Sequence, residues 1–312
     1  MSITWSDVSY SRISITFLVA MCAMVLPSTW FSEHIVLIAF FLILLGVPHG
    51  AGDYWIFAYL TKQLASKTRQ FRFVMYYFGV LAIYGLIWWI APFAAFLIFL
   101  GISVFHFGQS NWNYLADYNR YISVFTYLLW GIAILGVPIL IYHQEASLII
   151  KEITGTHINL DSIWRFYIIY GLIIINIIHI ALMFFYGAIS RTLFLKELAG
   201  FVTLMTLFFT TPLLIGFGFY FVFWHSVDAM YDQINILRLD NKYAIRPFLY
   251  QVAALSFLSF VGLGLLYLLV GRNMNYGLNM GVLFLFISMI TVPHSILMDR
   301  LYYSAINKTM NL

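Results

Sequence analysis

The sequence is poor in charged residues and in cysteine. Only 9% of its 312 residues are Asp, Glu, Lys or Arg, whereas a soluble domain carries about 25%. A chain with so little charge cannot cover itself with a polar surface, so we expect no sizeable soluble domain. The formal net charge of +4 is scattered, so nucleic acid is not an expected partner. Cys22 is the single cysteine, which excludes an internal disulfide and a cysteine-bound metal cluster.

Long apolar stretches take the place of the missing charge. Hydrophobic residues make up 63% of the chain, and a helix needs about 20 such residues to cross the hydrocarbon core of a bilayer. Polar or Pro/Gly-containing breaks separate ten stretches of roughly this length. They lie at 13–31, 34–58, 71–90, 92–114, 121–142, 163–187, 193–210, 212–235, 247–270 and 278–301. The sequence therefore predicts one all-α, polytopic integral membrane domain over residues 1–312, with the first stretch retained as a helix.

The distribution of Lys and Arg predicts how this bundle is oriented. Ten spans place both termini on one side of the membrane. With the N-terminus in the cytoplasm, thirteen Lys and Arg, Arg12 among them, lie on the cytoplasmic side, and three lie outside. Positive charge gathers on the cytoplasmic side of membrane proteins, so the bias supports both the number of helices and the orientation. We expect a multi-pass protein of the cell membrane.

Five of the eight histidines fall inside the even-numbered stretches, each 13 to 16 residues after its stretch begins. At 1.5 Å per residue, this spacing predicts one common depth, about 20–24 Å from the outer end. Ionisable side chains at membrane depth are costly and mark function, and several neutral imidazoles together suit a transition metal. The alternative for each histidine is a hydrogen bond to a neighbouring helix. The five are His49, His106, His179, His225 and His294.

Acidic residues follow three of these histidines. Asp53 lies four residues after His49, and Asp228 lies three after His225, so we expect each acid to share a helix face with its histidine. A metal-bound imidazole usually gives its other N–H to a carboxylate or a carbonyl, and Asp53 and Asp228 suit that role. Asp299 follows the last histidine by five residues, and it suits the cytoplasmic interface equally well.

Two of the histidines directly follow proline, in Pro48-His49 and Pro293-His294. Proline inside a spanning helix frees a backbone carbonyl and bends the axis. Such a bend can aim the following histidine toward the interior of the bundle.

Four motifs carry these residues: PHGAGD at 48–53, FHFGQSN at 105–111, FVFWHS at 221–226 and VPHSILMD at 292–299. With them the chain resembles, over nearly its whole length, the Brp/Blh family of membrane β-carotene 15,15′-dioxygenases. The resemblance implies cleavage of the central double bond of β-carotene by dioxygen into two retinals, with Fe(II) as the cofactor. It also implies that His49, His106 and His225 are iron ligands, and that the retinal serves a retinal-binding microbial rhodopsin.

Two positions depart from the pattern of that family. A second histidine there follows the third-motif histidine by four residues, and this chain has Ala229 at that place. An acid commonly closes the second motif, where this chain has Asn111. We expect His294 to supply the fourth metal ligand, with His179 as its rival, and Asn111 to lie beside the ligands.

Other functions also fit the residues. Intramembrane His and Asp could serve a proton-coupled transporter with broken helices, and a carotenoid- or haem-binding protein without catalysis is a further alternative. A carotenoid would enter from the lipid bilayer into a tunnel of aromatic and aliphatic side chains. Imidazole also binds zinc and copper, so the ligand type does not by itself select iron.

Overall fold

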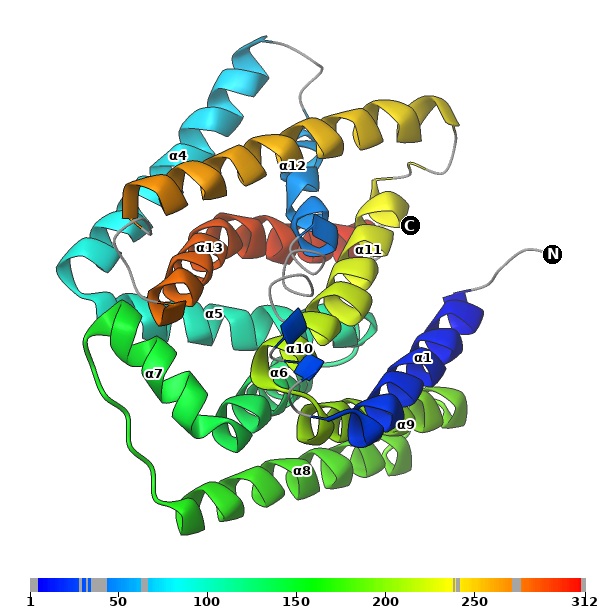
Figure 1. Ribbon diagram of the computed structural model, residues 1–312. Coiled ribbons are helices and arrows are strands. Elements are labelled where there is room, and N and C mark those ends of the chain that lie inside the picture. Colours follow the sequence, from blue (N-terminus) through cyan, green and yellow to red (C-terminus); the bar gives the residue numbers. More distant parts are fainter. Residues whose placement is uncertain are drawn as a thin grey trace.

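The computed structural model describes residues 5–27, 30–31, 33–34, 44–62, 67–237, 239, 242–270 and 276–309. These residues form helices and connecting turns, and no strand occurs among them. Figure 1 shows the helices gathered into one bundle, with α12 and α8 on opposite sides of the view. The predicted all-α, polytopic fold is confirmed.

The described residues form a succession of helices along the chain. Their bounds are α1 (Trp5–Val25), the 3₁₀-helix η1 (Val47–Gly52), α3 (Asp53–Leu60), α4 (Lys67–Ile90), α5 (Pro92–Trp112), the 3₁₀-turn η2 (Asn113–Leu115), α6 (Arg120–Ile141), α7 (His143–Thr154), α8 (Ser162–Phe185), α9 (Arg191–Thr210), α10 (Leu213–Tyr220), the π-helix η3 (Phe221–Ser226), α11 (Val227–Ile236), α12 (Lys242–Val270) and α13 (Tyr276–Thr309).

Eight helical segments among the described residues are long and apolar enough to cross a membrane. They are Lys67–Ile90, Pro92–Leu115, Arg120–Ile141, Ser162–Phe185, Arg191–Thr210, Leu213–Ile236, Ile245–Leu265 and Gly281–Ala305. Each corresponds to one of the ten predicted stretches. The first predicted stretch overlaps α1, whose apolar part, Tyr10–Val25, is shorter. The second lies partly outside the described residues, at 35–43, and continues into η1 and α3.

Short polar side chains and proline set where several helices begin. The side chains of Asn119, Asp161 and Ser190 accept hydrogen bonds from backbone N–H groups in the first turns of α6, α8 and α9, which would otherwise lack partners. Pro92 starts α5, where its missing N–H costs nothing. Gly155 ends α7 with a left-handed φ of 73°, which glycine adopts readily. Local sequence thus explains these five boundaries.

Two segments of the structure differ from the prediction. The residues between the predicted stretches 121–142 and 163–187 contain the amphipathic helix α7, which packs against α13. The segment predicted as one helix over 34–58 contains the 3₁₀-helix η1 around Pro48 before α3 begins. Proline lacks the N–H that an α-helix needs, so a tighter 3₁₀-turn takes its place.

Helices α5 and α6 pack closely against each other, and glycine makes this approach possible. A Cβ atom on Gly108 would overlap the backbone carbonyl of Tyr127, and one on Gly131 would overlap that of Val104. Small residues at such positions let two membrane helices touch through their backbones. The largest buried cluster lies around this pair and includes Trp112 and Trp130, both almost fully buried. This rigid pair positions the histidine of α5.

Helix α1 packs along α9, and the two lie side by side in Figure 1. Helix α13 contacts α4, α5 and α7, while α12 contacts η1. Through these contacts η1, α5, η3 and α13 converge in the middle of the bundle, although up to about 250 residues separate them along the chain.

Candidate metal centre

Four of the five predicted histidines meet in the interior. Each comes from a different element: His49 from η1, His106 from α5, His225 from η3 and His294 from α13. The ring of His49 lies 5.0 Å from that of His225 and 4.9 Å from that of His294, measured between centroids. The ring of His106 lies 4.8 Å and 5.2 Å from the same two rings. The four side chains close a circle, which we call the histidine cluster, and all are buried.

The nitrogen atoms of three cluster histidines lie close enough together to hold a cation. The possible ligand atoms of His49, His225 and His294 all lie within 4.8 Å of one another, and His106 adjoins two of these rings. Both nitrogens of His106, Nδ1 of His225 and Nε2 of His294 are buried without a hydrogen-bond partner. Unsatisfied buried polar atoms are costly and rare. Their concentration at one point fits a transition metal, for which neutral imidazole is a common ligand.

Hydrogen bonds fix the orientation of two of the four imidazoles. His49 Nδ1 lies 2.5 Å from the carbonyl oxygen of Gly46 and 3.2 Å from Ser226 Oγ. Because Ser226 donates to the carbonyl of Phe221, His49 Nδ1 carries the hydrogen and Nε2 is left for a metal. His294 Nδ1 lies 2.7 Å from Asp53 Oδ1, which in the same way directs Nε2 toward the cluster.

Asp53 thus serves a different histidine from the one predicted. It was expected to support His49, four residues earlier on a common face. The intervening residues lie in a 3₁₀-helix, which has three residues per turn, so a spacing of four no longer keeps two side chains aligned. Asp53 is buried and also accepts a hydrogen bond from Tyr77 at 3.2 Å. It links α3, α4 and α13 at the edge of the cluster.

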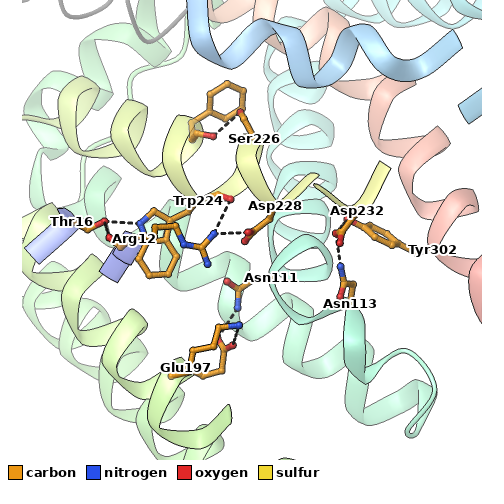
Figure 2. A network of polar contacts seen from close by, with 12 residues as sticks. Arg12, Thr16, Asn111, Asn113, Glu197, Trp224, Ser226, Asp228, Asp232 and Tyr302 are labelled. Carbon is orange, nitrogen blue, oxygen red and sulfur yellow. Dashed lines mark hydrogen bonds and ion pairs between the residues drawn. The ribbon is translucent and has the colours of Figure 1, made fainter. Parts of the chain in front are cut away.

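The other two predicted neighbours of the cluster find partners elsewhere, as Figure 2 shows. Asp228 forms an ion pair with Arg12 at 2.5 Å, and no hydrogen bond joins it to His225 among the described contacts. Asn111 donates to Glu197 on α9 at 3.0 Å. Asp299, whose role the sequence left open, accepts from Gln109 at 2.9 Å.

His179 does not join the cluster. Its Nε2 lies 2.8 Å from Thr126 Oγ1 on α6, which is the interhelical hydrogen bond expected of an isolated membrane histidine. The fifth member of the predicted layer therefore fastens α8 to α6, and of the two rivals for the fourth position His294 is the one that lies in the cluster.

Two residues around His49 were not singled out from the sequence. Gln233 on α11 is fully buried and donates to the backbone carbonyl of His49 at 2.8 Å. Ser226 approaches the imidazole itself. The seven-residue spacing of Ser226 and Gln233, two helical turns, places both on one face of the helix toward η1. That spacing is the signal from which they could have been found.

An apolar cavity of about 190 Å³ lies next to the cluster, and none of its lining residues is a histidine. Helices α5, α6, α7, α10 and α13 enclose it, and Thr291 is the one polar side chain among its lining residues. Phe107 and Phe221 line the cavity and also contact His225. Their ring centroids lie 4.6 Å and 5.6 Å, respectively, from the centroid of the His225 ring. A hydrocarbon in this cavity would lie against Phe107 and Phe221, which in turn contact His225.

Comparison with known proteins agrees with this geometry. The family model of β-carotene 15,15′-dioxygenase matches residues 40–302, which include the whole histidine cluster. The β-carotene 15,15′-dioxygenase of an uncultured marine bacterium 66A03 is 24% identical over 266 residues, which are 83% of this chain and 91% of that protein. No solved structure gives a significant match. Because the family model covers most of its length, the chain belongs to the β-carotene 15,15′-dioxygenase family.

Proposed function

We propose that this protein cleaves β-carotene at its central double bond with dioxygen and releases two molecules of retinal. In this proposal His49, His106, His225 and His294 hold Fe(II). The observation that carries it is the junction of the histidine cluster with an apolar cavity through Phe107 and Phe221. Family membership supports the reaction class, since the family model bears the name of this activity.

The residues of the chain divide the work between binding and orientation. The cavity would hold the polyene by apolar burial, and aromatic rings such as Phe107, Phe217 and Phe221 present flat faces to a conjugated chain. Helices α5, α10 and α13 would exclude water from the double bond. Iron(II), when bound, would supply the activation of dioxygen. Asp53 would keep His294 in the tautomer that offers Nε2.

The fourth ligand position in this proposal comes from α13. Ala229 is fully buried in a cluster of apolar side chains with Ile56, Leu297 and Met298, so that position has no donor atom to offer. His294 instead brings an unpartnered Nε2 to the cluster. This replacement supports an active enzyme, because the number of imidazoles around the site stays at four.

Localisation and partners follow the chemistry of the substrate. β-Carotene dissolves in a bilayer, so we place the protein in the cell membrane, where its apolar helices meet lipid. The retinal product has a natural acceptor in a retinal-binding microbial rhodopsin.

Reconstitution in detergent tests the proposed reaction. The purified protein is loaded with Fe(II) without oxygen, mixed with β-carotene, and exposed to dioxygen; we expect loss of the carotenoid absorbance and two retinals per substrate by chromatography. His49→Ala, His106→Ala, His225→Ala and His294→Ala should each lower the rate by at least about 100-fold, since each removes a ligand. His179→Ala is the matched control and should keep most of the activity. Bound pigment without turnover in the iron-loaded protein would overturn the proposal.

A further inference from the structure

A buried cation of α1 reaches the helix that carries His225. Arg12 Nη1 lies 2.5 Å from Asp228 Oδ1 and 3.4 Å from the backbone carbonyl oxygen of Trp224. The side chains of Arg12 and Asp228 are 7% and 13% exposed, respectively. The sequence placed Arg12 on the cytoplasmic side with twelve other Lys and Arg residues, and the structure adds that its side chain is buried. A buried cation needs a partner, and Asp228 provides it.

Helix α1 contacts residues on both sides of His225 in the sequence. The carbonyl that Arg12 approaches belongs to the residue before His225, and the carboxylate that it binds lies three residues after. The guanidinium also lies over the indole ring of Trp224, 4.3 Å from its centroid. The indole N–H of Trp224 donates to Thr16 at 2.9 Å, and Thr16 donates to the carbonyl of Arg12 at 2.8 Å. Figure 2 shows these groups converging on one turn.

The turn that they hold is the π-helix η3, Phe221–Ser226. A π-turn carries one extra residue relative to an α-helical turn and occurs frequently at functional sites, and the extra residue changes the direction of the side chains that follow it. His225 sits in this turn, and its buried Nδ1 has no hydrogen-bond partner. His49 and His294 are oriented by their own hydrogen bonds. His225 is oriented instead by its ring contacts with Phe107 and Phe221 and by its backbone, which α1 contacts on both sides of it.

We propose that α1 is a working part of the metal centre and that Arg12 is a positioning residue for His225. The inference rests on the proposed metal-binding function of the histidine cluster. Helix α1 lies outside residues 40–302, which the family model matches, so family membership does not assign it this role.

Cobalt(II) titration of the detergent-purified, full-length protein tests the inference without requiring turnover. Co²⁺ reports both affinity and ligand geometry through its visible absorption. Arg12→Met should weaken Co²⁺ binding about 10- to 100-fold, as the loss of a partner that orients a ligand does, and should change the shape of the spectrum. Arg12→Lys keeps the charge and should recover part of the affinity. Arg191→Met, at the exposed start of the neighbouring helix α9, is the control and should bind like the wild type.

A double variant separates positioning from stability. Arg12→Met leaves the buried Asp228 unpaired, whereas Arg12→Met with Asp228→Leu removes both charges, and such replacements often restore stability. We expect the double variant to regain the wild-type melting temperature and still bind Co²⁺ weakly. If the double variant regained both the wild-type melting temperature and the wild-type Co²⁺ affinity, the inference would be overturned. Wild-type Co²⁺ affinity in Arg12→Met would overturn it as well. A wild-type protein that binds no Co²⁺ would overturn the metal centre itself, which is a separate failure.

Discussion

At the scale of single residues, Asp53 connects the cluster to the rest of the bundle. It accepts hydrogen bonds from His294 and from Tyr77, and its side chain is buried. A carboxylate that accepts from an imidazole N–H fixes the tautomer and raises the basicity of the other nitrogen. The quality of His294 as a ligand therefore depends on a residue from another helix.

Replacing Asp53 by Asn tests this dependence. Asn keeps the size of the side chain and removes its charge, so the hydrogen bond to His294 weakens while the packing stays. We expect metal affinity to fall about 10- to 100-fold, measured by competition with a chelator of known affinity. Asp299→Asn is the matched control, because Asp299 accepts from Gln109 and no hydrogen bond joins it to a histidine among the described residues. Equal affinities in the two variants would contradict the role of Asp53.

The sequence predicted the four cluster histidines but paired their neighbours incorrectly. Depth along a helix follows from residue counting, so His49, His106, His225 and His294 were found together. The direction in which a side chain points around the helix axis changes with the helix type. Because His49 lies in a 3₁₀-turn, Asp53 points to His294 and not to His49. Asp228 was predicted to support His225 but pairs with Arg12, because no local pattern reveals a partner 216 residues away.

At the scale of elements, the α5–α6 contact depends on two glycines that face opposite backbones. Ala at Gly131 would press its Cβ against the carbonyl of Val104, and the two helices would have to separate. Overpacking of this kind costs about 1–3 kcal/mol. We expect Gly131→Ala to lower the melting temperature in detergent by several degrees. Gly101→Ala on α5 is the control, because nothing lies within 4 Å of its Cβ position, and it should melt no lower than the wild type.

Helix α7 forms one wall of the cavity, so its side chains offer a test of substrate access. Ile149 lines the cavity, whereas its neighbour Leu148 points outward and is 61% exposed. Ile149→Trp should fill part of the cavity and raise KM for β-carotene about tenfold. Leu148→Trp introduces the same side chain facing away, and its kinetics should match the wild type. Initial rates at varied carotenoid concentration decide, and unchanged kinetics in Ile149→Trp would exclude the cavity as the substrate site.

Element types were harder to predict than element positions. Hydropathy located the spans, because about 20 apolar residues cross a bilayer whatever their packing. Hydropathy could not show the π-turn at Phe221–Ser226, because its residue types are those of any apolar helix. Its residues contact α1 and η1, which lie far away in the sequence. Helix α7 was not predicted because its 12 residues are too few to span a bilayer.

At the scale of the whole molecule, the orientation in the membrane remains a prediction from charge. Even without Arg12, which is buried, twelve of the other fifteen Lys and Arg lie on the predicted cytoplasmic side. The positive-inside rule therefore still places both termini in the cytoplasm. Fusion of a fluorescent protein and of alkaline phosphatase to the C-terminus checks this, with fluorescence and no phosphatase activity expected. Active phosphatase would mean an odd number of spans or the reverse orientation.

The almost purely hydrocarbon wall of the cavity bears on how products depart. Thr291 is the one polar side chain in that wall, and its hydroxyl already donates to the carbonyl of Ile287. An aldehyde group formed there would find little to replace the water that it prefers. Retinal would therefore be held less firmly than the parent hydrocarbon. The apolar lining that binds the proposed substrate would therefore favour release of the aldehyde product toward the polar headgroups of the surrounding lipid.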